Sequence, residues 1–157
     1  MCFVLAYLVC TKEILLDETQ REWQMLLMER FFSQIHDEYR KNISVNTHVD
    51  GSIENYCSWT GIACTAKAVT TVSYTQLDHG LFRIDSLPPT AIKLWISIAN
   101  QTGVLCVRRL PRNLELFSVS VNQYYGHLDL TSLPHNLVAM NARANNFSGP
   151  LVLTHLP

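Results

Sequence analysis

A 23-residue repeat is the feature of this sequence that most constrains its fold. The dipeptide Leu-Pro recurs four times at a constant interval, at 87–88, 110–111, 133–134 and 156–157. Glycine recurs at the same interval, at 80, 103, 126 and 149. Because two independent markers keep one period, the second half of the chain is predicted to be stacked copies of a single structural unit.

Each copy of the unit carries two sets of apolar positions. The second, fourth and seventh residues after each glycine are apolar in all four copies, as in Phe82, Ile84 and Leu87. Each of the first three Leu-Pro pairs is followed by an alternating stretch, such as 94–96, with the period of a strand that buries one face. One such unit cannot bury its apolar face alone, so the units are expected to stack through a parallel sheet.

The polar and special residues of the unit are predicted to build the scaffold. Asn122 and Asn145 share one position before the glycine, and Ala99 occupies that position one repeat earlier. An inward asparagine can bond backbone groups in a tight turn, glycine permits a sharp loop, and proline belongs outside central strands. The first copy, VTTVSYTQLDHG, fits only if its strand lies one residue closer to its glycine.

The whole unit, L-x-x-L-x-L-x-x-N-x-F-S-G-x-L-x-L-x-x-L-P, resembles the leucine-rich repeat. The resemblance implies an α/β solenoid, a short leucine-rich-repeat horseshoe with a parallel β-sheet and a helical N-terminal cap. Its particular form is similar to the repeats in surface and secreted leucine-rich-repeat proteins of trypanosomatid protozoa. The resemblance covers 69–157, as about four units at 69–90, 91–113, 114–136 and 137–157.

The segment 13–68, before the repeats, is predicted to be the cap. Apolar residues at helical spacing predict one helix over 13–40, and the polar stretch 41–56 predicts a loop. Two interpretations stay open for the apolar segment 1–12, a weak or truncated signal segment or an apolar lead-in that packs on the helix. The buried stripe of the helix is predicted to include Leu16, Trp23, Met25, Leu26, Leu27, Phe31, Phe32 and Ile35.

The cap segment contains the stretch CSWTGIAC, from Cys57 to Cys64. A zinc site would need more ligands at short spacing, yet His48 and His79 are isolated in the sequence. A redox pair favours two intervening residues, whereas six separate these cysteines. A structural disulfide is the third alternative, and it would place the protein in an oxidising compartment.

The order C-x-W-x-G-I-x-C in this stretch resembles the N-terminal cap of plant-type leucine-rich-repeat ectodomains. The resemblance implies that Cys57 and Cys64 form a disulfide and that Trp59 packs over the first repeat. An extracellular or cell-surface location is therefore expected, with the cytoplasm as the alternative. Three N-x-[ST] acceptors agree with this location and are predicted glycosylation sites, at Asn42, Asn100 and Asn146.

The charge balance excludes one class of partner. The chain has 12 Lys and Arg against 13 Asp and Glu, so no basic field attracts nucleic acid. No cofactor and no metal site are predicted. Since five cysteines are an odd number, at least one thiol is free or pairs outside the chain, and the states of Cys2, Cys10 and Cys106 stay open.

Function is predicted to lie on the concave strand face. Trp95 is the strongest candidate there, because exposed aromatic residues often anchor interfaces. The leading hypothesis is a non-catalytic module that binds a protein or glycan ligand, since no convergent catalytic constellation is recognisable. The outward positions proposed for binding are Lys93, Trp95, Ser97, Ser118, Ser120, Asn141 and Arg143, in strands that also expose Leu116 and Ala139.

A structural fragment is the alternative hypothesis. The last repeat is predicted to leave an apolar layer uncovered, because no polar closing segment follows Leu156 and Pro157. Further repeats or a partner are therefore expected to cover the C-terminal edge, as in the N-terminal part of a longer receptor-like leucine-rich-repeat protein.

Overall fold

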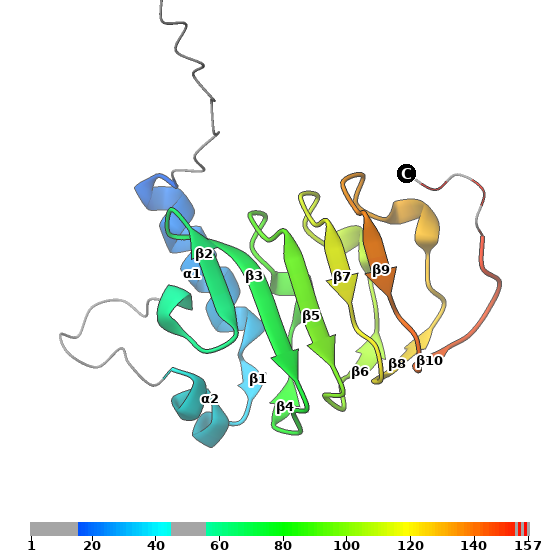
Figure 1. Cartoon of the computed structure of the whole chain (residues 1–157), viewed down its shortest axis with the longest axis horizontal. Helices are drawn as coiled ribbons and strands as arrows, with labels where there is room; N and C mark the ends of the chain where they lie inside the picture. Colours follow the sequence, from blue (N-terminus) through cyan, green and yellow to red (C-terminus); the bar gives the residue numbers. More distant parts are fainter. Residues whose placement is uncertain (1–15, 45–55, 153, 155, 157) are drawn as a thin grey trace, which may run out of the picture.

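The main sheet of the protein has five strands, one from the cap and one from each of the four repeats. The computed structural model describes residues 16–44 and 56–152, together with 154 and 156. Figure 1 shows the strands side by side, with the cap at one end of the row. The strand order in this sheet is β2 (Ile62–Thr65), β3 (Ala68–Thr75), β5 (Lys93–Ser97), β7 (Leu116–Ser118) and β9 (Ala139–Asn141). Within it β2 and β3 pair antiparallel, and the other neighbours pair parallel.

A second, three-stranded parallel sheet forms the other side of the repeats (Figure 1). The repeats that contain β5 and β7 pass from the main sheet to this sheet, then through a short 3₁₀ turn, and back to the next strand. The apolar positions after the first three glycines lie along this return path and pack into the core between neighbouring repeats, whereas Leu151 and Leu156 of the last copy are exposed. The elements are β6 (Thr102–Val104), η3 (Val107–Arg109), β8 (Gln123–Gly126), η4 (Leu130–Ser132) and β10 (Asn146–Phe147).

The strand register keeps the interval of the sequence repeat. Phe117 of β7 pairs with Leu94 on one side and with Met140 on the other, and each partner is 23 residues away. Val72 of β3 pairs with Leu94, which is only 22 residues further along the chain. The prediction that the first strand lies one residue closer to its glycine is therefore confirmed.

The inward amides close the turns between repeats, as predicted for the scaffold. Asn122 accepts hydrogen bonds from the amides of Ala99 and Gln101, at 3.0 and 3.2 Å. Sequence reasoning missed Gln101, which is buried. In the repeat where Ala99 replaces the asparagine, the side chain of Gln101 bonds the backbone of the turn instead. Its side chain accepts from the Phe82 amide at 2.7 Å and donates to the Gly80 carbonyl at 2.9 Å.

The prediction of one helix over 13–40 is wrong. Helix α1 (Glu18–Phe31) begins at a capping box between Asp17 and Gln20, and it is followed by β1 (Gln34–Ile35) and α2 (Asp37–Ile43). The helix stops because β1 pairs with β4 (Gly80–Leu81), a contact with the first repeat that no local pattern encodes. Residues 1–15 and 45–55, with the predicted signal segment, most of the predicted loop, Cys2 and Cys10, lie outside the described residues.

The predicted buried stripe is only partly confirmed. Leu16, Phe31, Phe32 and Ile35 are buried as predicted, but the other four positions are not. Trp23 is 61% exposed and Leu26 is exposed, whereas Met28 is fully buried. The polar Gln24 faces the sheet, where it accepts from the Val69 amide at 2.8 Å and donates to the Lys67 carbonyl at 2.9 Å. These bonds turn the helix, because they satisfy backbone groups at the start of β3 that would otherwise be buried unpaired.

An aromatic cluster joins the cap to the first repeat. The ring of Phe32 lies at its centre, 4.9 Å from Trp59, 5.9 Å from Phe82 and 6.0 Å from Tyr74. All four side chains are buried. Because Tyr74 and Phe82 belong to the first repeat, the cap covers the apolar end of the stack as predicted.

The stretch CSWTGIAC closes on itself through a disulfide between Cys57 and Cys64, as the resemblance implied. The Cα atoms of the two cysteines are 5.6 Å apart, and Gly61 between them has a φ of +87°. A side chain at Gly61 would collide with the Tyr74 ring, so the short loop can pack against β3 only with glycine here.

Removing this disulfide is expected to lower the free energy of unfolding by about 2.5 kcal/mol, from the entropy of the short loop that it closes. The test is urea unfolding of the double variant Cys57→Ser, Cys64→Ser against wild type. Cys106→Ser is the control, because Cys106 is exposed and unpaired among the described cysteines. Equal losses from the two changes would contradict a stabilising role for the bridge.

Candidate binding face

The side of the main sheet that points away from the core is called the binding face here. Strand register places the predicted outward residues in cross-strand rows. Lys93, Leu116 and Ala139 form one row, and Trp95, Ser118 and Asn141 form the next. Residues at equivalent positions of neighbouring repeats thus lie side by side and can contact one partner together.

Trp95 is the largest accessible side chain of this face. It lies in β5, the central strand of the main sheet, and it is 49% exposed. Neither the cap helix nor a loop covers it, although Trp59 of the cap is buried. A half-exposed indole in the middle of a sheet offers a flat apolar surface and one N–H donor, which is the kind of group that anchors interfaces.

Three serines predicted to face outward are instead buried. The hydroxyl oxygen of Ser97 lies 3.0 Å from that of Ser120 and 3.3 Å from that of Ser118. All three side chains are almost wholly removed from solvent. The expectation that they are accessible is wrong, because their small hydroxyls bond to one another between neighbouring strands and remain below their larger neighbours.

Two positive charges lie at separate places on the binding face. Lys93 is exposed in β5, and Arg143 is exposed just beyond β9. Neither forms an ion pair with any residue in the described part of the chain. The Oδ1 atom of Asn141 accepts from the Arg143 amide at 3.2 Å, so its amide nitrogen remains available to a ligand.

Sequence reasoning missed the contribution of the first repeat to this face. Thr71 and Ser73 of β3 lie in register with Lys93 and Trp95, and Ser73 is exposed beside Trp95. The shortened spacing of the first repeat was the signal that could have identified them.

Exposed apolar residues at the ends of the strands were also missed. Ile98 and Val121 occupy equivalent positions, with φ values of 55° and 56°. Branched residues rarely adopt this left-handed conformation, so both positions carry backbone strain. Hydrogen bonds to the next repeat hold them there, from the Ile98 amide to the Ser120 carbonyl and from the Val121 amide to the Arg143 carbonyl. They form an apolar rim beside the binding face.

The three predicted glycosylation acceptors are all exposed. Asn42 lies in α2, Asn100 lies in the turn before β6, and Asn146 begins β10. Glycosylation itself remains a prediction. Among the described residues, no helix is long and apolar enough to cross a membrane, and no three His, Cys, Asp or Glu side chains gather in a metal-binding group.

The parallel main sheet, the return path through a second sheet and the helical N-terminal cap define a short leucine-rich-repeat-like fold. Solved structures of plant leucine-rich-repeat proteins share this architecture. The leucine-rich-repeat ectodomain of the Arabidopsis receptor kinase HAESA, solved with an N-terminally extended IDA peptide hormone ligand, is 16% identical with a TM-score of 0.54. A plant ice-binding protein is 15% identical with a TM-score of 0.52.

These similarities concern the fold alone, because the sequence identities are low. The matched region covers 85% of this chain but 27% of the HAESA chain, and 80% of this chain but 49% of the ice-binding chain. This chain therefore spans about a quarter and about half of the lengths of the two proteins. No protein-family model and no curated protein sequence matches the chain.

Proposed function

We propose that this chain is a non-catalytic binding module that recognises an extended segment of a partner protein through its binding face. The observation that carries this proposal is Trp95, half exposed on the central strand with polar neighbours on both sides. The peptide ligand of the HAESA ectodomain supports a protein segment as the partner, because the two chains share the fold. A glycan is the other class of ligand, and the experiment below distinguishes it.

The proposed contacts follow from the chemistry of the face. The indole of Trp95 packs against an apolar or aromatic side chain of the partner. Ser73 on the neighbouring strand and Asn141, two strands away in the same row, bond the partner's polar groups. Lys93 and Arg143 have no acidic partner within the described chain, so they favour a segment that carries Asp or Glu. The ligand does not contact the three buried serines, Ser97, Ser118 and Ser120. Their mutual hydrogen bonds instead hold neighbouring repeats together beneath the exposed residues.

The experiment that tests this function is selection from a display library of random peptides with the wild-type protein as bait. We expect acidic peptides with an aromatic residue to be enriched. Trp95→Ala should weaken their binding at least tenfold, as at interface anchors. Trp23→Ala, which removes another exposed tryptophan from the cap, is the matched control and should leave affinity unchanged.

Equal capture by wild type and by Trp95→Ala would contradict the proposed face. If no peptide is selected and the protein instead binds a glycan array in a Trp95-dependent way, the ligand is a glycan and not a protein segment. Lys93→Gln and Arg143→Gln should each reduce affinity for acidic peptides and leave neutral peptides unaffected.

We further propose that the module works outside the cell or at its surface. The Cys57–Cys64 disulfide supports this location because disulfides persist in oxidising compartments. Exposure of the three acceptor asparagines and the similarity of the repeats to those of trypanosomatid surface proteins agree with it. Two free thiols at these positions in protein from its native source would contradict the proposal.

The edge of the last repeat supports the second candidate function, the N-terminal part of a longer receptor-like array. Leu151 and Val152 are exposed there, as is Val138 before β9. Further repeats or a partner protein would bury these side chains. Slower amide exchange in β9 and β10 of such an assembly is expected, and unchanged exchange would contradict this covering role.

A further inference from the structure

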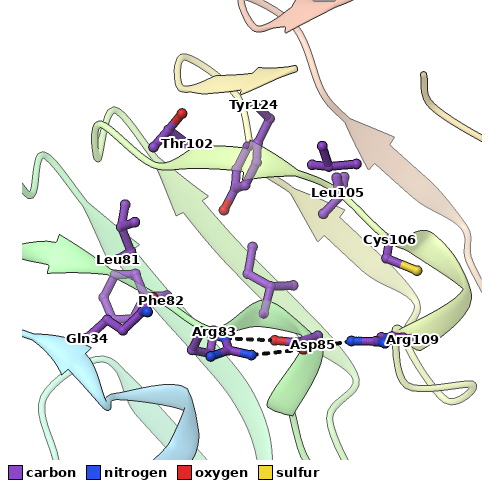
Figure 2. A pocket seen from close by; sticks show the side chains of 12 residues that line it. Gln34, Leu81, Phe82, Arg83, Asp85, Thr102, Leu105, Cys106, Arg109 and Tyr124 are labelled. Carbon is purple, nitrogen blue, oxygen red and sulfur yellow. Dashed lines mark hydrogen bonds and ion pairs between the residues drawn. The ribbon is translucent and has the colours of Figure 1, made fainter. Parts of the chain in front are cut away.

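A polar hollow with a volume of about 300 Å³ lies outside the binding face. Its walls come from the return paths of the first repeats, and none of the residues that line it belongs to the main sheet. Figure 2 shows a charged group along one wall, with the side chain of Tyr124 entering from another. The hollow is large enough for a small organic molecule and is separate from the proposed protein-binding site.

One wall of the hollow carries net positive charge. Asp85 of η2 (Ile84–Ser86) accepts from Nε of Arg83 at 3.3 Å and from Nη1 of Arg109 at 3.2 Å. Burial raises the pKa of Asp85, but the hydrogen bonds and charges of these arginines outweigh it and hold the pKa below its ordinary value. Asp85 is therefore ionised, and two arginines against one carboxylate leave one positive charge.

Arg109 has donors to spare in this arrangement. Within the described part of the chain its guanidinium bonds only to Asp85, through Nη1, and the side chain is 64% exposed. Its Nε and Nη2 atoms can therefore donate to an anion in the hollow without disturbing the ion pair. A guanidinium presents such donors in a planar fork that matches a carboxylate.

Tyr124 supplies a second and independent sign of a ligand. Only 5% of the residue is exposed, and its hydroxyl bonds to no residue in the described part of the chain, while the oxygen atom itself remains accessible to the solvent in the hollow. The equally buried Tyr74, by contrast, donates to the Thr60 carbonyl at 2.7 Å. Burial raises the pKa of Tyr124, so its hydroxyl is a neutral donor at ordinary pH.

The orientation of Tyr124 directs this unused donor into the hollow. The residue belongs to β8 and lines the hollow, and in Figure 2 its hydroxyl points toward the wall that carries Arg83 and Asp85. Water can occupy this position in the free protein, and an oxygen atom of a ligand can replace that water.

We propose that this hollow binds a small organic acid with one negative charge, an apolar body and an oxygen that accepts a hydrogen bond from the Tyr124 hydroxyl. The acid group lies against Arg109, and the apolar body packs on the aliphatic lining of Leu81, Ile84 and Leu105. Because Tyr124 and Arg109 belong to different repeats, a bound acid links neighbouring repeats and stabilises the stack.

The probe for this site is 4-oxo-4-phenylbutanoate, which carries a carboxylate, a ketone oxygen and a phenyl ring. We expect saturable binding with a dissociation constant of about 1 mM or lower, in the range of small ligands of this size. Two matched compounds separate the two contacts. The amide of the probe lacks the charge, and 4-phenylbutanoate lacks the ketone.

Two variants of the protein complete the test. Tyr124→Phe is expected to weaken binding of the probe about threefold to tenfold and to leave binding of 4-phenylbutanoate unchanged. Arg109→Gln is expected to weaken both acids about tenfold and to leave the amide unchanged. The matched controls, Tyr125→Phe and Arg108→Gln, alter a tyrosine and an arginine that do not line the hollow and should change nothing.

Two readouts report occupancy of the hollow. The first is the change in NMR chemical shift of the amides around Arg109. The second is the rate of Cys106 alkylation, which should fall when the probe binds because Cys106 lines the hollow. Absence of probe binding at 10 mM, about tenfold above the expected constant, would overturn the proposal. So would equal affinity in Tyr124→Phe, or shifts confined to the main sheet. Trp95→Ala should not affect the probe, so failure here is distinct from failure of the protein-binding function.

Discussion

Replacing Phe32 by alanine is expected to lower the free energy of unfolding by about 3–5 kcal/mol, the usual cost of removing a buried aromatic ring. Phe32 is fully buried at the centre of the aromatic cluster, within 6.0 Å of ring centres from both the cap and the first repeat. Its removal leaves a cavity where the cap and the first repeat share a core. Urea unfolding followed by circular dichroism measures the loss.

The control for this change is Trp23→Ala in α1, the helix that ends directly before Phe32. Trp23 is 61% exposed, so its removal should cost less than about 1 kcal/mol. The contrast is informative because the sequence pattern assigned both residues to one buried stripe. A larger loss from Trp23 than from Phe32 would show that α1 packs in a different rotation from the one described.

Asn122→Ala is expected to cost about 3–4 kcal/mol, which is a large effect for a polar residue. The side chain accepts from the amides of Ala99 and Gln101, and neither amide has another acceptor in the described chain. Each buried N–H left unpaired costs about 1–3 kcal/mol. Thermal and urea unfolding of the variant measure the sum of these losses.

Asn145→Ala is the comparison variant for this experiment, because Asn145 occupies the same position in the next repeat. It makes similar bonds, to the Tyr124 amide at 3.0 Å and to the Val119 carbonyl at 2.8 Å, but it is only partly buried. Water can replace some of the hydrogen bonds that Asn145 makes, so the loss in free energy of unfolding should be about 1–2 kcal/mol. A smaller loss from Asn122 than from Asn145 would contradict the view that buried turn amides hold the stack together.

The repeats were predictable from sequence because their pattern is local and recurs. Phe117 pairs with Leu94 and Met140 at the interval that glycine and Leu-Pro mark along the chain. The shortened first repeat was predictable for the same reason. The disulfide followed from the resemblance of CSWTGIAC to a known cap, and the structure confirms it.

The binding face was predictable only in part. The alternation of strand residues predicted correctly that Trp95 and Lys93 point outward, because neighbouring residues of a strand face opposite sides. It could not distinguish an accessible outward residue from a covered one. Ser97, Ser118 and Ser120 are covered because their hydroxyls bond across strands, and the distances between strands are not part of a sequence pattern.

The sequence by itself determined the period of the stack, the asparagines that close two of its turns and the rows that the later repeats contribute to the binding face. These features depend on contacts between equivalent positions, so one local pattern repeated at a constant interval is enough to specify them. Tertiary structure alone decided where α1 ends, because β1 leaves the helix to pair with β4 of the first repeat. It also decided the hollow around Tyr124 and Arg109, whose walls extend from Gln34 to Tyr124 and are brought together only by packing.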